Sequence, residues 1–78
     1  MTNTLTPGIA AGFPTPPDVV VSVAIAGIWR VERDGATIGY IQETGQRFVS
    51  LLGRVYNTSI EVAQTLTLDN AVRRLLAI

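Results

Sequence analysis

The fold is decided by residues 28–42, which read IWRVERDGATIGYIQ. Two segments that alternate apolar and polar residues flank the dipeptide Asp34-Gly35 in this stretch. Asp-Gly between such segments is the strongest short signal for a β-hairpin, because both central residues of a type I′ turn need a positive φ. We therefore expect antiparallel strands at residues 28–33 and 36–42.

The alternation sorts the side chains of this hairpin onto two faces. A two-residue turn places Trp29 opposite Tyr40 and Val31 opposite Ile38. These four side chains then form one apolar face through cross-strand pairs, and the polar residues occupy the other face. An antiparallel sheet with one face against a core is the structure that this pattern predicts.

The sheet is expected to continue toward the C-terminus. Thr44-Gly45 predicts a second tight turn into a strand at residues 47–52, with Tyr40 facing Val49. A fourth strand is predicted at residues 60–66, where apolar side chains alternate again.

The chain is expected to end in a helix over residues 68–77. Thr67 is a good N-cap, and Asp69 in the first turn is favourable at the positive end of the helix dipole. One apolar stripe has the spacing of a helix face that packs on a core: Leu68, Ala71, Val72, Leu75 and Leu76. The fold class is therefore α+β, with three to four strands packed against this helix.

The N-terminal part is less regular. Residues 1–17 contain all four prolines and predict a flexible arm, leaving residues 18–78 as a single small domain. Residues 16–27 can form a helix or a strand. The sequence TPPD at residues 15–18 is typical of a helix start, whereas the β-branched run at residues 19–25 favours a strand. We favour the helix.

Composition limits the chemistry. The 78 residues have no net charge, and they include no Cys, no His and no Lys, so that all six cations are Arg. Without these residues there is no thiolate or imidazole to act as nucleophile, base or metal ligand. We expect no enzyme activity and no cofactor, and we take the exclusive use of Arg to indicate a bacterial or phage genome.

The sequence also predicts a cytoplasmic protein. The first residues lack the basic segment of a secretory signal. The most apolar stretch, residues 19–29, is about half of the roughly 20 residues that a membrane-spanning helix needs.

DNA binding is the alternative function. Arg30, Arg47 and Arg54 are expected on or beside the polar face of the sheet, and a sheet backed by a helix can place strands in the major groove. The order of three strands and a helix resembles the arm-type domains of phage integrases, over about half the chain and without a diagnostic motif. Zero net charge opposes this alternative, since phosphate contacts need an excess of cations.

Protein–protein contact is the favoured function. One helix can cover only one face of a sheet, and four apolar residues are expected to need cover elsewhere: Ile28, Ile41, Phe48 and Leu52. Small domains without disulfides or metals often gain stability by association. Either the N-terminal segment covers these residues within the chain, or a second subunit does. We therefore expect a small binding or structural accessory protein that acts through protein–protein contacts at these residues, and we favour a homodimer over another protein partner.

Overall fold

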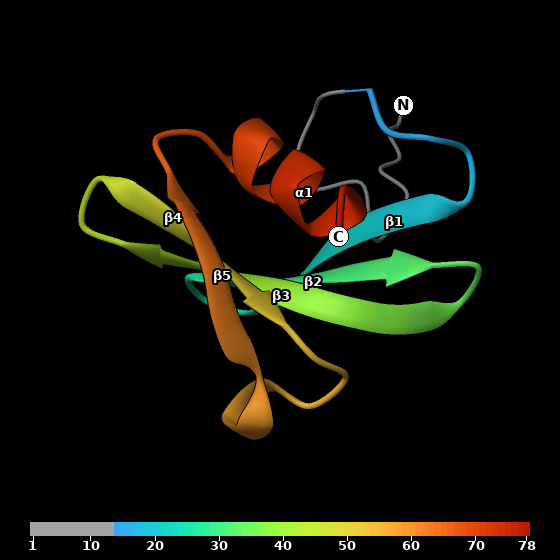
Figure 1. The fold of residues 1–78 in the computed structure, drawn as a ribbon, viewed down its shortest axis with the longest axis horizontal. Coiled ribbons are helices and arrows are strands. Elements are labelled where there is room, and N and C mark those ends of the chain that lie inside the picture. The colour runs from blue at the N-terminus through green and yellow to red at the C-terminus, as the bar shows by residue number, and fades with distance from the viewer. Residues whose placement is uncertain (1–13) are drawn as a thin grey trace, which may run out of the picture.

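The computed structural model describes residues 14–78, and these form one antiparallel sheet with one helix on it (Figure 1). The sheet has five strands, each paired with the next in the chain. The elements are β1 (Val19–Ile25), β2 (Ile28–Arg33), β3 (Ala36–Thr44), β4 (Arg47–Leu52), a 3-10 turn (Tyr56–Thr58), β5 (Ile60–Thr65) and α1 (Leu68–Leu76). The α+β class is confirmed, but the sheet has five strands rather than three to four.

The additional strand is β1, so the helix favoured for residues 16–27 is wrong. Val19 and Val21 are buried while Val20 between them is 41% exposed, which is the two-residue period of a strand. The Pro16 carbonyl accepts from the Val19 amide at 2.9 Å and closes a turn in place of the first turn of a helix. The β-branched run and its pairing with β2 therefore outweigh the helix-start signal.

The first hairpin turn is confirmed, but the pairing beyond it is not. Asp34 and Gly35 have φ of 53° and 80°, as a type I′ turn requires. A bulge then leaves Ile38 without an opposite residue on β2, since Val31 pairs with Gly39 and Glu32 pairs with Thr37.

This bulge moves side chains between the two faces. Trp29 pairs with Ile41, and Tyr40 pairs with Arg30, instead of Trp29 pairing with Tyr40. Because successive strand residues point to opposite faces, Trp29 and Tyr40 lie on opposite sides of the sheet. The predicted apolar face of four residues is therefore wrong.

The second turn is displaced by one residue. Thr44 pairs with Arg47, so the central residues are Gly45 and Gln46 rather than Thr44 and Gly45. Gly45 has a φ of 62°, and a type II′ turn requires Gly at this first central position, where a β-branched Thr would be strained. Tyr40 consequently pairs with Leu51 and not with Val49.

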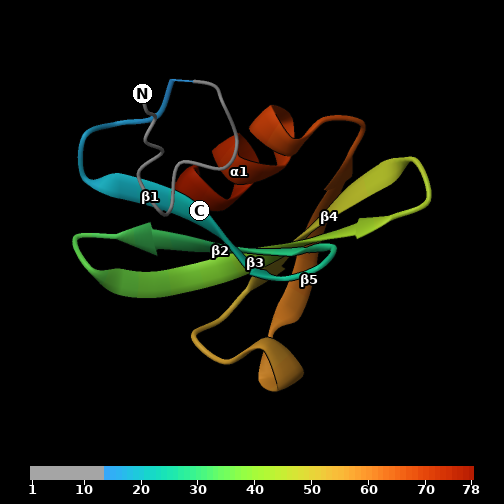
Figure 2. The same cartoon turned by 180° about the vertical axis from the view of Figure 1, so that it is seen from behind.

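The core lies between the sheet and α1, which packs on β3, β4 and β5 on one side of the sheet in both views (Figures 1 and 2). Its buried members come from β1, β2, β3 and α1: Val19, Val21, Val31, Ile41, Ala71, Val72 and Leu75. Ser50 is also fully buried, and its hydroxyl donates to the Ala71 carbonyl at 2.8 Å. This bond ties β4 to the helix without leaving the buried hydroxyl unsatisfied.

The predicted helix is confirmed to within one residue at its C-terminus. The Thr67 hydroxyl accepts from the Asn70 amide at 3.1 Å, which is the N-cap bond expected from the sequence. Asp69 and Arg73 form an ion pair at 2.9 Å on the exposed side. No helix within residues 14–78 is long and apolar enough to cross a membrane.

Candidate interaction surface

The face of the sheet turned away from α1 is covered at its centre by the chain itself. The connection between β4 and β5 lies on this side, opposite the helix (Figures 1 and 2). Its Tyr56 ring packs edge-on against Tyr40, with 5.7 Å between the ring centroids. The Tyr56 hydroxyl donates to Gln42 Oε1 at 3.0 Å, and the Tyr40 hydroxyl donates to the Arg54 carbonyl at 3.0 Å. This face therefore needs no partner to cover Tyr40.

The four apolar residues predicted to form an interface do not share one surface. Ile41 is fully buried, and Phe48 and Leu52 are partly buried against the core beneath α1. Ile28 lies on the other face, because it pairs with Gln42. The bulge at Ile38 causes this separation, because it shifts β2 by one residue relative to β3 and so places Ile28 on the face opposite Ile41. The displaced turn changes the β3–β4 pairing by two residues and leaves the faces unchanged.

The three arginines of the DNA-binding alternative are also spread out. Arg30 is half-buried beside Tyr40 on the face away from α1. Arg47 begins β4 and Arg54 follows its end, so they are about 20 Å apart along an extended chain. Both are exposed, and Glu32 lies on the same face as Arg30, where strand alternation also places Arg47. These residues do not form one basic patch.

Exposed apolar side chains concentrate instead on the two edge strands of the sheet. On β1, Val23 is 55% exposed and Ile25 is 63% exposed. On the opposite edge, Ile60 of β5 is 67% exposed, and Leu66 immediately after β5 is 70% exposed. The run at residues 19–25 is the signal in the sequence for the first of these edges, once the segment is taken as a strand.

The outer edge of β1 has unused backbone hydrogen-bonding groups. The Asp18 carbonyl accepts from the Asp34 amide at 2.8 Å, so the backbone groups of alternate residues from Asp18 point toward β2. Those of Val19, Val21 and Val23 consequently point outward. The Val19 amide donates to Pro16, as described above, and the Val19 carbonyl accepts from the Thr15 hydroxyl at 3.4 Å. The outward groups of Val21 and Val23 have no partner within residues 14–78.

The edge at β5 is better protected against pairing. Glu61 places a charge on this strand, and its side chain accepts from Gln64 at 2.7 Å. A bulge beside Val62 also interrupts the pairing with β4. Charges and bulges are the usual devices that prevent an edge strand from pairing with another chain. β1 carries no charged residue, so it is the more open edge.

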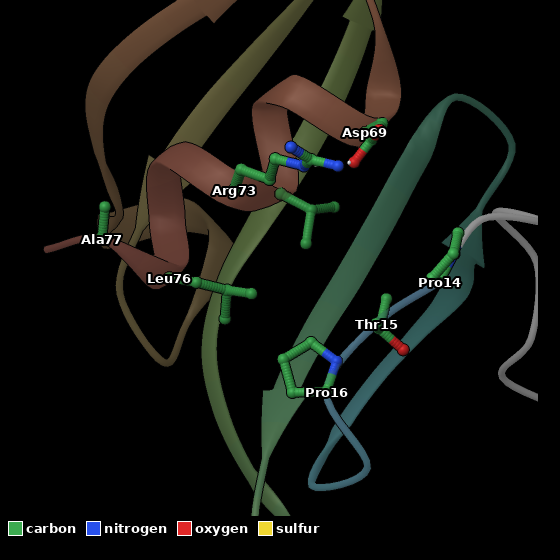
Figure 3. A pocket seen from close by; sticks show the side chains of 8 residues that line it. Pro14, Thr15, Pro16, Asp69, Arg73, Leu76 and Ala77 are labelled. Carbon is green, nitrogen blue, oxygen red and sulfur yellow. Dashed lines mark hydrogen bonds and ion pairs between the residues drawn. The ribbon is translucent and has the colours of Figure 1, made fainter.

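A shallow groove lies between α1 and residues 14–16, which precede β1 (Figure 3). Its volume is about 490 Å³, and its lining is mostly apolar. One wall is formed by residues 14–16, and Val72 and Leu76 belong to the helix wall. The Asp69–Arg73 ion pair supplies the charged groups of the lining. Residues 1–13 of the flexible arm predicted for residues 1–17 lie outside the described residues, which begin at Pro14.

Residues 14–78 contain no group of three Asp or Glu side chains placed to hold a metal ion. Comparison with protein families, curated proteins and solved structures finds no match. The feature with the clearest chemical capacity is therefore the backbone edge of β1, which can accept another strand.

Proposed function

We propose that the protein is a small non-enzymatic binding or structural protein that acts through protein–protein contacts, and that it self-associates. The supporting observation is the outer edge of β1, where the backbone groups of Val21 and Val23 have no partner among residues 14–78 and lie between exposed apolar side chains. An extended segment of another polypeptide can add to such an edge as a further strand. Main-chain hydrogen bonds supply affinity in this mode, and side chains supply selectivity.

The size of the chain supports association. A domain of this length has a small core and little stability in excess, and small natural domains commonly add disulfides, metals or a second subunit. The sequence has neither Cys nor His, so it can form no disulfide and lacks the commonest ligands of a structural metal. A cytoplasmic location and a bacterial or phage origin stay predictions from the sequence.

The proposal is tested by sedimentation of the unmodified protein over a range of concentrations, beside two matched variants. Val23→Lys places a charge on the β1 edge, where it would be desolvated by a paired strand. Leu66→Lys places the same charge at a comparably exposed position next to β5. We expect Val23→Lys to weaken self-association at least tenfold and Leu66→Lys to leave it unchanged. A protein that stays monomeric up to high micromolar concentration contradicts the proposal.

The alternative is a DNA-binding accessory protein that uses Arg30, Arg47 and Arg54. Its support is that Arg30 lies on the sheet face away from α1, where strand alternation also places Arg47. Such binding depends on phosphate contacts, so it predicts retention on heparin that falls steeply with salt. No retention at low salt removes this alternative.

A further inference from the structure

We infer that the partner of the β1 edge is a second copy of this chain, paired antiparallel about a two-fold axis that passes beside Ser22. This inference rests on the proposed function and specifies its partner and register. It follows from the backbone groups that β1 leaves free within residues 14–78 and from the side chains between them.

The free groups determine the possible registers. In an antiparallel pair, two residues whose amide and carbonyl point toward each other exchange two hydrogen bonds. Among the described residues, the outward groups of β1 that have no partner belong to Val21 and Val23. If Val21 of one copy pairs with Val23 of the other, the two-fold axis generates a second, identical pair. The amides and carbonyls of Val21 and Val23 in both copies, eight groups in all, then form four hydrogen bonds. Ser22 then lies opposite Ser22 of the second copy.

The neighbouring registers leave groups unused or in conflict. An axis at Val20 or at Val21 requires the outward groups of Val19, which already bond to Pro16 and Thr15. An axis at Val23 requires Ile25, which lies beyond the irregularity that β1 shows between Val23 and Ile25. The register centred on Ser22 uses the outward amides and carbonyls of Val21 and Val23, and it leaves the bonds from Val19 to Pro16 and Thr15 intact.

The side chains of β1 are compatible with this self-pairing. β1 has no charged residue, so the two-fold brings no like charges together. On the helix side of the sheet, Val21 of each copy meets Val23 of the other, and this contact covers a side chain that is now 55% exposed. On the opposite side, the two Ser22 hydroxyls face each other, as hydroxyl pairs do in many sheets. β5, by contrast, carries the charged residue Glu61.

The register is tested by disulfide formation, for which this chain is well suited because it has no Cys of its own. In the inferred dimer, the two residues at position 22 form a non-hydrogen-bonded pair with Cα atoms about 4.5 Å apart, within the range of a disulfide. Ser22→Cys should therefore form a covalent dimer under mild oxidation. Val20→Cys is the matched control on the same strand and face. Its two copies would lie about 13 Å apart, too far for a disulfide.

We expect Ser22→Cys to cross-link at least tenfold faster than Val20→Cys at equal concentration. A second measurement uses the unmodified protein: the Val21 and Val23 amides should exchange with solvent more slowly as the concentration rises, whereas the Leu66 amide should not change. If the protein self-associates but Val20→Cys cross-links faster, or if the two amides show no added protection, this register is overturned and the proposed function stands. If the unmodified protein does not self-associate, both fail.

Discussion

Gly39 is a residue at which the addition of a single methyl group should cause a large loss of stability. It lies in β3 with Leu51 beside it on β4 and Leu75 of α1 above it. A methyl group at this position would overlap the Leu51 carbonyl oxygen and come within 3.0 and 3.1 Å of the two Leu75 methyl carbons. Carbon atoms in good contact lie about 3.5–4.0 Å apart, so Gly39→Ala must displace the backbone of the neighbouring strand and shift the Leu75 side chain.

The expected cost follows from these contacts. Overpacking of a well-filled core costs about 1–3 kcal/mol, and we expect the upper part of this range because one obstacle is backbone rather than a flexible side chain. Gly39 does not have a positive φ, so no conformational penalty is added. A small domain loses about 4–8 °C in Tm for each kcal/mol, which predicts a decrease of about 10–20 °C.

The assay is thermal and urea denaturation at one fixed protein concentration, followed by circular dichroism and by the fluorescence of Trp29, the single tryptophan. Gly45→Ala is the control, because a methyl group there meets nothing within 4 Å but must adopt a φ of 62°. Its cost is conformational and should be about 1–2 kcal/mol. If Gly39→Ala is no less stable than Gly45→Ala, the close approach of Leu51 and Leu75 does not exclude a side chain at position 39, and the reasoning is refuted.

Three further substitutions test other parts of the fold by the same denaturation assay. Tyr56→Ala removes the ring that covers Tyr40 and should cost about 2–4 kcal/mol of stability. Tyr56→Phe should cost about 1 kcal/mol, because it loses one hydrogen bond and keeps the ring. Equal losses would contradict a covering role of the ring. Thr67→Ala should cost about 1 kcal/mol through the lost N-cap, and an unchanged Tm would show that the cap bond is not needed. Ser50→Ala should cost about 1–3 kcal/mol, since a buried hydrogen bond to α1 is lost, and a gain in stability would contradict this assignment.

The parts of the fold that the sequence predicted well are those with strong local signals. Asp34-Gly35 identified the first hairpin because few dipeptides accept two positive φ angles. The strand at Arg47–Leu52 and the start of the helix after Thr67 agree with the prediction, since strand alternation and an N-cap depend on neighbouring residues. None of these signals requires knowledge of a distant part of the chain.

The candidate site could not be predicted in the same way. The bulge at Ile38 lies within an alternating segment, where the neighbouring Gly39 indicates a bulge or a close backbone approach but does not fix the register. The prediction therefore assigned Ile41 and Phe48 to an uncovered face, whereas both pack beneath the helix. The prediction also overlooked β1 as the open edge, because the TPPD segment before it favoured a helix.

By itself, the sequence determined that the chain forms a hairpin-based sheet, that a capped helix ends it, and that imidazole and thiol chemistry are absent. Only the tertiary structure decided which side chains face the helix and which strand lies open at the edge of the sheet. The physical reason is the two-residue period of a strand: a shift of one residue exchanges the faces of every residue beyond it. Such shifts are fixed by contacts between strands and with α1, as at the bulge beside Ile38. The β1 edge, on which the proposed self-association depends, follows from the strand order, which places no strand outside β1 within residues 14–78.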